Sequence, residues 1–444
     1  MSGSPDDTIV APATPVGRGA LAIVRLDGPG SSRILTAMSG SAPPPVRHAA
    51  LTELMHKGIV IDQCIVVRYE APHSFTGNDL IEFTLHGNPL LVSTLLSAAV
   101  DLGARIAEPG EFTERAVLNG KIDLVQAESI ADLIDARTAL QARLSLANLG
   151  GRLSEQAAAL RQMLLDVIAR LEAALDFSDE GYEFIAREEV MSDIGQAIAE
   201  VTGLSETYRR GRATTAGLSA VILGRPNAGK STLLNRLVGT ERAIVTPIAG
   251  TTRDIVTETI EIGGLPVTLA DTAGLRESSD AIEEIGVARA REAAARADLI
   301  LYLIAVDEGM TEEDRSAIGG LTEQEVVVLY TKTDLQPAPA ETIGISVKSG
   351  MGMGELLARL DALVRERFAA PEGSPAIVNE RQRAALDECR SALAAALASA
   401  EEHREEQIIL VDLYRASTAL GLLTGAITAD EVFGEIFARF CIGK

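Results

Sequence analysis

Hydrophobic and polar positions change their period several times along this chain of 444 residues. In the first part, apolar or alternating runs at 21–26, 64–69 and 80–85 are separated by proline and glycine clusters, which predicts β-strands. An apolar run over 90–102 predicts a helix beside them. Residues 1–120 are therefore expected to form an α+β domain.

Helical spacing begins near residue 123 and continues through alanine-rich segments to about 210. The segment 211–217, rich in glycine and threonine, is predicted to be a linker. Helical spacing resumes after 376 and runs to the end of the chain. We expect 121–215 and 373–444 to be two halves of one helical domain that pack together.

Residues 216–372 alternate strand and helix patterns, which predicts an α/β domain. Its strands are expected at 218–223, 266–270, 299–305 and 326–330, and 369–375 is expected to be the exit linker. The predicted fold class is multidomain α/β, with the α/β domain inserted into the helical domain.

Composition limits the partners of the chain. Hydrophobic residues make up 47%, enough for several cores, whereas aromatic residues make up 3% and tryptophan is absent. Extensive stacking on single-stranded nucleic acid is therefore not expected. The net charge of −23 does not steer the protein to RNA, so any contact with nucleic acid is local or comes from a partner.

The chain carries no pattern for export or membrane insertion. Residues 1–7 are polar and acidic, unlike a signal peptide, and the apolar run 299–306 is far shorter than the ~18 residues of a membrane span. The cysteines at 64, 389 and 441 are too scattered for a disulfide framework or a zinc site. We expect a cytoplasmic protein without a membrane partner.

Residues 224–231 match G-x-x-x-x-G-K-S without a mismatch and lie between a predicted strand and a predicted helix. In such a loop the backbone N–H groups converge on phosphate oxygens. Lys230 adds a positive charge near the β- and γ-phosphates, and Ser231 can ligate Mg²⁺. The sequence therefore predicts a nucleoside triphosphate site.

Two further segments suit a nucleotide switch. Asp271 ends an apolar strand and can hold Mg²⁺ through water, while the N–H of Gly274 in the same D-T-A-G run can sense the γ-phosphate. A hydroxyl within 250–254 can complete the Mg²⁺ shell only while the γ-phosphate is present. A plain polar turn is the alternative for 250–254.

Residues 331–334 predict the base. The carboxylate of Asp334 can accept hydrogen bonds from guanine N1–H and N2–H₂, which adenine lacks, and the stem of Lys332 can cover the base. Thr331 replaces the Asn of the usual N-K-x-D, a departure that bears on nucleotide affinity more than on base choice. Residues 346–348 resemble the S-A-K loop whose backbone N–H meets guanine O6.

The residue that positions water in Ras-like proteins is missing. Those proteins carry Gln directly after D-T-A-G, and this chain has Leu275, which cannot orient water. Hydrolysis must recruit another group, and Glu283 and Glu284 in the acidic segment 280–286 are the candidates. A solvated helix face is the alternative for these carboxylates.

These motifs resemble the MnmE (TrmE) family of tRNA-modification GTPases, within the TrmE-Era-EngA-like P-loop GTPases, over nearly the whole chain. Beyond the nucleotide motifs, the resemblance rests on 13–19, 74–77, 108–116 and the terminal F-C-I-G-K. It implies action at C5 of wobble uridine 34 of tRNA, where an aminomethyl or carboxymethylaminomethyl group is added. It also implies a homodimer that works with the flavoprotein MnmG, as a heterotetramer, with FAD and NADH supplied by that partner.

The resemblance further implies ligands. A folate-binding-like N-terminal dimerisation domain would hold a 5-formyl- or methylene-tetrahydrofolate at Arg25, Glu82, Lys121 and Lys444. K⁺ would bind at Asn227, Thr246, Ile248 and Thr251, Mg²⁺ at Ser231 and Thr252, and Glu283 would orient the attacking water. K⁺ binding would couple dimerisation of the GTPase domains to hydrolysis. The implied GTP contacts are Asn227, Ala228, Gly229, Lys230, Ser231, Thr232, Thr246, Pro247, Ile248, Ala249, Gly250, Thr251, Thr252, Asp271, Thr272, Ala273, Gly274, Lys332, Asp334, Ser346, Val347 and Lys348.

Other interpretations stay open at this point. Cys441 is a possible participant in tRNA modification or a structural cysteine. The whole chain could be a regulatory, ribosome-assembly-type GTPase, although no G-x-x-G in a basic segment follows residue 376. It could also be a folate-dependent one-carbon transferase in which GTP is only regulatory.

Overall fold

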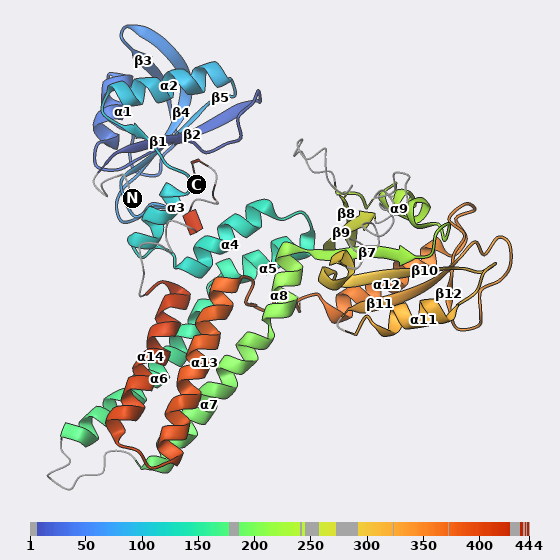
Figure 1. Cartoon of the computed structure of the whole chain (residues 1–444). Helices are drawn as coiled ribbons and strands as arrows, with labels where there is room; N and C mark the ends of the chain where they lie inside the picture. The colour runs from blue at the N-terminus through green and yellow to red at the C-terminus, as the bar shows by residue number, and fades with distance from the viewer. Residues whose placement is uncertain are drawn as a thin grey trace. The chain divides into compact units, whose positions relative to one another are not determined.

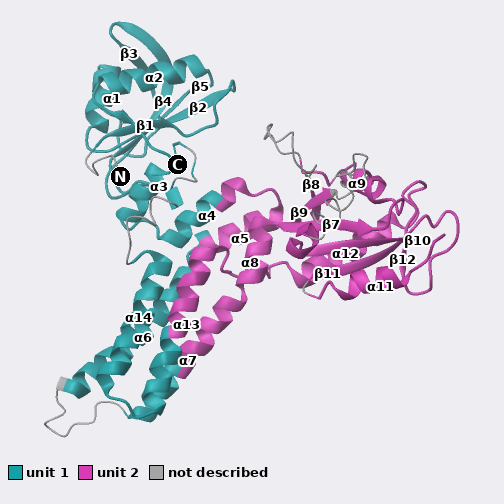
Figure 2. Cartoon of the chain, viewed as in Figure 1, with its two compact units in different colours: residues 1–131, 149–194, 392–444 teal, residues 132–148, 195–391 magenta. Residues whose placement is uncertain are grey.

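The computed structural model describes residues 7–176, 186–239, 242–244, 257–271, 292–322, 324–371, 373–426, 436–437, 440 and 442–443. The chain divides into two compact units, shown in Figure 2. Unit 1 comprises Met1–Ala131, Leu149–Ile194 and Ala392–Lys444, and unit 2 comprises Asp132–Asn148 and Gly195–Ser391.

Among its described residues, unit 1 contains a six-stranded sheet in the order β3-β4-β5-β2-β1-β6. Its strand pairs are antiparallel except for β1 and β6, which run parallel. The strands are β1 (Ile9–Pro12), β2 (Leu21–Asp27), β3 (Ala50–His56), β4 (Ile59–Tyr69), β5 (Leu80–His86) and β6 (Arg105–Ile106).

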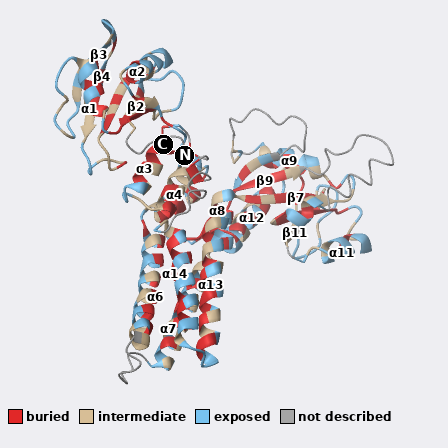
Figure 3. Cartoon of the chain, turned by 60° about the vertical axis from the view of Figure 1, so that its left-hand side comes forward, coloured by how far each residue is buried: buried red, intermediate tan, exposed pale blue. Residues whose placement is uncertain are grey.

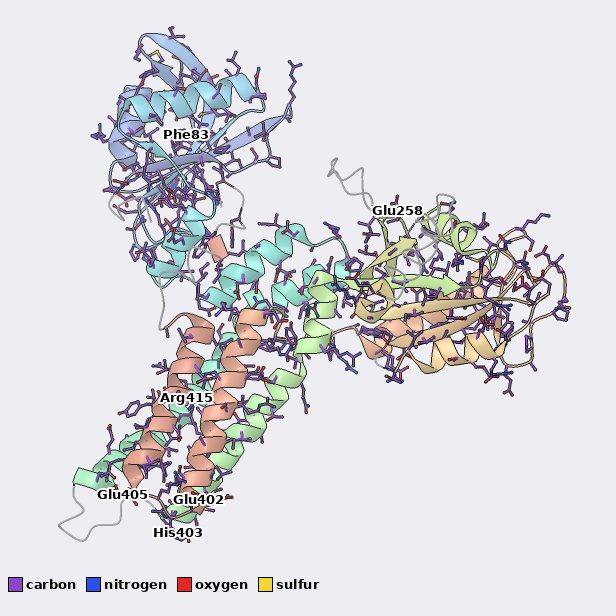
Figure 4. The ribbon with its side chains drawn as sticks, viewed as in Figure 1. Phe83, Glu258, Glu402, His403, Glu405 and Arg415 are labelled. Atoms are coloured by element: carbon purple, nitrogen blue, oxygen red, sulfur yellow. The ribbon has the colours of Figure 1, made fainter. Side chains whose placement is uncertain are left out.

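Two helices cover one face of this sheet, α1 (Ser31–Ser39) and α2 (Pro89–Asp101). The side chain of Asn88 accepts a hydrogen bond from Leu90 N and so caps α2, and Pro89 at the first position of the helix suits its start. Phe83 lies in the layer beneath α2 and is buried (Figure 4). Alternate residues of β5 therefore point into this core.

Unit 1 also contains long helices, and α6 (Arg152–Asp176) lies beside α14 (Glu406–Thr424), as Figure 1 shows. The apolar positions 160, 164, 167 and 171 of α6 are buried, which agrees with the helical spacing in the sequence. Arg187, the first residue of α7 (Arg187–Glu206), donates to the Glu406 carboxylate at 3.0 Å. Two shorter helices follow the sheet in the sequence, α3 (Glu111–Leu118) and α4 (Leu124–Asp135).

Unit 2 contains a second six-stranded sheet among its described residues, in the order β12-β11-β10-β7-β9-β8. Its strand pairs are parallel except for β8 and β9. All seven residues of β10 are buried, as expected for a central strand covered on both faces. In Figure 3 the labelled strands β7 and β9 of the same sheet show red, buried segments. The strands are β7 (Leu218–Gly224), β8 (Thr257–Ile262), β9 (Leu265–Asp271), β10 (Leu299–Ala305), β11 (Glu325–Thr331) and β12 (Ile343–Gly344).

Helices lie on both faces of this second sheet. Apolar residues of α9 (Lys230–Val238) and α12 (Met353–Arg367) pack into one core with alternate strand residues. On the opposite face, α11 (Glu312–Gly319) and the helical segment 292–296 pack over smaller cores. The multidomain α/β fold class predicted from the sequence is confirmed.

The prediction of a linker at 211–217 is wrong, because residues 211–216 belong to helix α8 (Tyr208–Ala216) and Gly217 is its C-cap. A Cβ at Gly211 would lie 2.1 Å from the carbonyl oxygen of Ile377. This glycine therefore permits a close approach of two backbones inside unit 2 and does not supply flexibility. The neighbouring helices in unit 2 are α5 (Ala139–Leu149) and the first half of α13 (Glu380–Glu401).

Candidate functional sites

The loop 224–231 joins the end of β7 to the start of α9 in unit 2, as the sequence predicts. Asn227 has φ +61° and Gly229 has φ +95°, so two residues of the loop, one on each side of Ala228, have positive φ. Such a sequence of conformations turns successive backbone N–H groups toward one point, where an anion binds. The N-terminus of α9 adds its dipole to the same point.

Gly224 has to be glycine at the entrance of this loop. Its φ is +135°, and a Cβ there would lie 2.3 Å from the carbonyl oxygen of Leu303 in β10. A side chain at this position would collide with the backbone of β10. Only glycine therefore allows β7 to pair closely with β10 at the place where the loop begins.

Lys230 folds back over the loop that carries it. Its Nζ donates to the carbonyl oxygens of Gly224 and Arg225, both at 2.8 Å. The ammonium group therefore lies beside the loop 224–231, where the anion would bind. Ser231 and Thr232, in the first turn of α9, are exposed beside it.

The topology brings the other nucleotide motifs to the same edge of the sheet. Because β7, β9, β10, β11 and β12 are parallel, their carboxyl ends share one edge. The P-loop follows β7, Asp271 ends β9, Asp334 follows β11 and the 346–348 loop follows β12. Ligands of open parallel sheets bind at this edge.

Thr331 links the base loop to the phosphate loop. Its hydroxyl is buried and donates to the carbonyl oxygen of Ala228 in the P-loop at 2.8 Å. From the sequence, Thr331 was only a departure from the usual Asn. The structure shows that the threonine hydroxyl makes a direct connection to the phosphate cradle.

The Asp334 carboxylate is held by a neighbouring side chain. The Ser346 hydroxyl donates to Asp334 Oδ1 at 2.7 Å, and this hydrogen bond lowers the pKa of Asp334. The Lys332 ammonium lies 3.0 Å from the Asp307 carboxylate in the loop after β10. The expected base-reading residues therefore meet in space, with Asp334 ionised.

Sequence reasoning missed Arg225, an unspecified position of the P-loop motif. Its guanidinium donates to the carbonyl oxygen of Gly309 at 2.6 Å and pairs with Glu308 at 2.9 Å and Asp314 at 3.3 Å. The Tyr302 hydroxyl also donates to Asp314 at 2.9 Å, and burial together with this hydrogen bond raises the pKa of Tyr302 to about 12. Arg225 thus fastens the P-loop to the loop after β10.

Several predicted site residues lie outside the described residues. For Asp271, only the backbone, at the end of β9, is described. The predicted site residues outside are Thr246, Pro247, Ile248, Ala249, Gly250, Thr251, Thr252, Thr272, Ala273, Gly274, Leu275, Glu283, Glu284, Cys441 and Lys444.

A second cluster lies on the sheet of unit 1. Arg25 in β2 is opposite Glu82 in β5, with Arg25 Nε 2.9 Å from Glu82 Oε1, and each side chain is 22% exposed. The Tyr69 hydroxyl donates to Glu82 at 3.4 Å, and the Arg25 guanidinium lies 5.4 Å from the centre of the Phe75 ring. Lys121 Nζ donates to the nearby segment 70–73, at the Pro72 carbonyl oxygen, at 3.0 Å.

The end of the chain returns to this domain. Ile442 forms an antiparallel bridge with Pro109. Gly443 has φ +95°, and a Cβ there would lie 1.9 Å from the carbonyl oxygen of Pro12. Pro12 is paired with Val24 next to Arg25. The motifs 13–19 and 108–116, far apart in sequence, therefore meet beside the terminal residues.

Other chemistry is limited in the part of the chain that the structure describes. No group of three or more His, Cys, Asp or Glu side chains is placed to hold a metal ion there. Within the same residues, no helix has both the length and the apolar character needed to cross a membrane. Burial raises the pKa of the Cys64 and Cys389 thiols to about 12, so neither is poised as a nucleophile.

A glycine-rich loop before a helix, on a parallel sheet whose next loops carry Thr331, Lys332 and Asp334, defines a P-loop GTPase domain. Two family models match the chain: the GTP-binding protein TrmE N-terminus over 8–121 and the MnmE helical domain over 124–441. The chain belongs to the MnmE family of tRNA modification GTPases.

Curated relatives match over their full lengths. A tRNA modification GTPase MnmE of Koribacter versatilis is 40% identical over 99% of this chain and 99% of its own. The protein of the same name from Moorella thermoacetica is 38% identical, and the one from Aquifex aeolicus is 39% identical. Both matches cover 99% of this chain and 100% of the relative. Among solved structures, Era of Aquifex aeolicus bound to GDP.AlF4⁻ aligns at 27% identity over 39% of this chain and 66% of that chain, with a TM-score of 0.27.

Proposed function

We propose that this chain is a GTP-hydrolysing subunit that modifies C5 of wobble uridine 34 in tRNA, adding an aminomethyl or carboxymethylaminomethyl group. The observation that carries the GTPase assignment is the Asp334 carboxylate, fixed by Ser346 at the same sheet edge as the P-loop. We propose four regions: a folate-binding-like dimerisation domain at 1–120, helical halves at 121–215 and 373–444, and the GTPase domain at 216–372. The compartment we propose is the cytoplasm.

In this proposal the phosphates of GTP bind the N–H groups between Asn227 and Thr232, and Lys230 supplies a positive charge. The Lys230 ammonium already stands at the loop through its bonds to Gly224 and Arg225. A bound Mg²⁺ neutralises phosphate charge, and Ser231 and Thr252 would hold it. Asp334, ionised through its bond from Ser346, would select guanine.

The remaining hydrolytic roles rest on the sequence. With Leu275 in the position of the Ras-type Gln, Glu283 would orient the attacking water. A bound K⁺ would supply positive charge beside the phosphates, held by Asn227, Thr246, Ile248 and Thr251. The exposed side chain of Asn227 suits this role because amide oxygens are hard ligands.

The unit 1 cluster supports a tetrahydrofolate site. Folate presents a carboxylate tail and a pterin edge with hydrogen-bond donors, which match Arg25 and Lys121 on one side and Glu82 on the other. The partly exposed Arg25–Glu82 pair and the return of Gly443 to Pro12 bring these groups and the position before Lys444 into one region. A 5-formyl- or methylene-tetrahydrofolate would supply the one-carbon unit.

The partners follow from the same proposal. The chain would act as a homodimer with an MnmG-type flavoprotein, as a heterotetramer, and the partner would bring FAD and NADH. Cys441 would be a possible participant in the modification and not in hydrolysis. Hydrolysis would be coupled to dimerisation of the GTPase domains, so the nucleotide would control chemistry in another part of the complex.

The test compares GTP hydrolysis in K⁺ and in Na⁺ and measures U34 nucleosides in a deletion strain complemented with this chain. We expect faster hydrolysis in K⁺, restoration of modified U34 by the wild-type chain, and loss of both by Lys230→Ala. Equal rates in the two salts would remove the K⁺ assignment. Unaltered U34 in the deletion strain would overturn the pathway. Full modification by Lys230→Ala would favour a folate-dependent transferase with a regulatory nucleotide.

A further inference from the structure

A cavity of about 570 Å³ in unit 2 lies between the end of α7, α8, the first half of α13 and the start of β7. Four arginines line it, and we call it the arginine pocket: Arg209, Arg212, Arg383 and Arg390. Arg209 and Arg212 are three residues apart on α8 and Arg383 and Arg390 seven apart on α13, so each pair shares a helix face.

Two of these guanidinium groups lie over aromatic rings. Arg383 lies 4.9 Å from the centre of the Tyr208 ring, and Arg209 lies 5.7 Å from the centre of the Phe368 ring. Such a cation–π contact holds a guanidinium group in place beside the pocket. The rings themselves are covered, so a nucleobase has no face there on which to stack.

The acidic residues of the arginine pocket do not neutralise all of its arginines. Asp387 is shared by Arg383 at 3.4 Å and Arg390 at 3.3 Å. Asp298 instead accepts hydrogen bonds from the backbone N and the hydroxyl of Ser219. Arg212 is exposed, and its guanidinium makes no hydrogen bond or ion pair with any described residue.

The pocket also contains a polar atom without a partner. The hydroxyl of Ser205 is buried and makes no hydrogen bond within the described part of the chain. Glu206 lies next to Ser205. With Asp298 and Asp387 it gives the pocket three carboxylates against four arginines, one more positive than negative side chain. A buried donor beside unpaired guanidinium groups suits an oxyanion.

We propose that the arginine pocket binds phosphates of the tRNA backbone. This inference rests on the proposed function in tRNA modification. A chain with a net charge of −23 needs a local cationic site for RNA, and arginine forks match phosphate oxygens. Because both aromatic rings are covered, the pocket suits a phosphodiester chain better than a free nucleotide, and it positions the RNA without reading bases.

The arginine pocket is separate from the GTP site. Gly217 and Leu218, which line it, stand at the start of β7, and the P-loop follows the other end of this strand. Seven residues of strand span roughly 20 Å. A tRNA phosphate held here would therefore not compete with GTP.

The experiment measures binding of a tRNA transcript to the full chain by fluorescence anisotropy across a series of KCl concentrations. The variants are Arg212→Ala and Arg209→Ala/Arg212→Ala. The matched control is Arg296→Ala/Arg315→Ala, which removes two exposed arginines paired with Glu292 and Glu312 elsewhere in unit 2. Thermal unfolding of each variant checks its fold, and Arg212→Ala removes a side chain without partners among the described residues.

We expect the double variant to bind tRNA about tenfold more weakly at low salt, with a salt slope shallower by about one phosphate contact. Arg209→Lys/Arg212→Lys keeps the charge and loses the fork, so its affinity should fall between wild type and the alanine variant. The control should match wild type.

Equal affinity and slope for the double variant and the control would overturn the proposal. The proposal would also be overturned if the arginine variants lost binding of inorganic phosphate, measured by calorimetry, and kept the tRNA affinity of the wild-type chain. Failure of the proposed function would be seen in a different measurement. The wild-type chain would then fail to restore modified U34 or to hydrolyse GTP, whatever the tRNA affinities of these variants.

Discussion

Asp334 shows how a single recognition residue depends on its neighbour. It follows a strand end and is accessible to a base, and the Ser346 hydroxyl from the loop after β12 orients its carboxylate at 2.7 Å. The hydrogen bond favours the ionised form, which alone accepts two hydrogen bonds from guanine. The two motifs, separate in sequence, therefore act as one unit.

Replacement of this carboxylate tests the base assignment. Asp334→Asn should shift preference from GTP toward XTP, because an amide pairs with the xanthine edge and leaves a guanine donor unpaired, a loss of about 1–3 kcal/mol. Competition of GTP and XTP against a fluorescent nucleotide measures this. Asp307→Asn, which removes a nearby carboxylate that pairs with Lys332, is the control and should keep GTP preference. Unchanged selectivity in Asp334→Asn would remove Asp334 from the site.

The same residue predicts a pH dependence. Because the bond from Ser346 lowers the pKa of Asp334, guanine binding persists as the pH falls and is lost only when Asp334 takes up a proton. Ser346→Ala should raise the pKa of Asp334 toward its usual value, so binding should be lost at a higher pH than in wild type. Titration of GDP affinity from about pH 7 down to about pH 2 measures both midpoints, because the usual pKa of an aspartate is about 3.9. Ser349→Ala serves as the matched control, and coincident midpoints would contradict the assigned role of Ser346.

At the scale of elements, side chains and a glycine join strands to loops. Thr331 at the end of β11 reaches Ala228 in the P-loop, and Gly224 at the end of β7 touches Leu303 in β10. Arg225 fastens the same loop to the segment after β10. The phosphate cradle is therefore held from three sides before any ligand binds, which is the preorganisation that electrostatic catalysis needs.

Thr331→Val tests one of these links. The isosteric change removes the hydroxyl and leaves the Ala228 carbonyl oxygen without its donor, at a cost of about 1–3 kcal/mol in the free energy of unfolding. Denaturant unfolding and GDP affinity should both report the loss. Thr333→Val is a close control, because the Thr333 hydroxyl is buried without a partner, so its removal should be neutral or stabilising. Equal effects of the two variants would show that the Thr331 bond adds nothing.

Helical and strand periods in the sequence were sufficient for most elements. The central strands β7, β10 and β11 and helix α6 follow their apolar runs closely, because burial on fixed faces requires that pattern. The error at 211–217 arose because glycine has two uses. The sequence pattern is the same for a glycine in a flexible linker and for Gly211, which allows the backbone of Ile377 to approach closely. Ile377 is 166 residues further along the chain, so no local pattern indicates this contact.

At the scale of the whole molecule, segments from opposite ends of the chain meet within each unit. In unit 1 the terminal residues reach Pro12 and Pro109, and α6 lies beside α14. In unit 2 the Asn148 side chain bonds the Ala376 backbone through both its nitrogen and its oxygen. The contact between Asn148 and Ala376 joins two segments of unit 2 that precede and follow its six-stranded sheet in the sequence.

Gly443→Ala tests the terminal contact and the proposed folate site together. The added Cβ would fall 1.9 Å from the Pro12 carbonyl oxygen at φ +95°, so the end of the chain must shift away. Affinity for 5-formyl-tetrahydrofolate, followed by calorimetry, should drop several-fold. Gly373→Ala is matched, with φ +73° and open space around its Cβ, and should bind folate like wild type. Full folate affinity in Gly443→Ala would separate the chain end from the site.

The sequence by itself determined the GTPase class, the order of α+β, helical and α/β regions and the identity of the phosphate and base loops, because local periodicity and turn chemistry are written in neighbouring residues. Only the tertiary structure decided that Thr331 bonds Ala228, that Ser346 orients Asp334 and that Arg212 faces a pocket beside Arg383. Such contacts join residues on different elements, and their partners are set by how the sheets and helices pack, which no local pattern encodes.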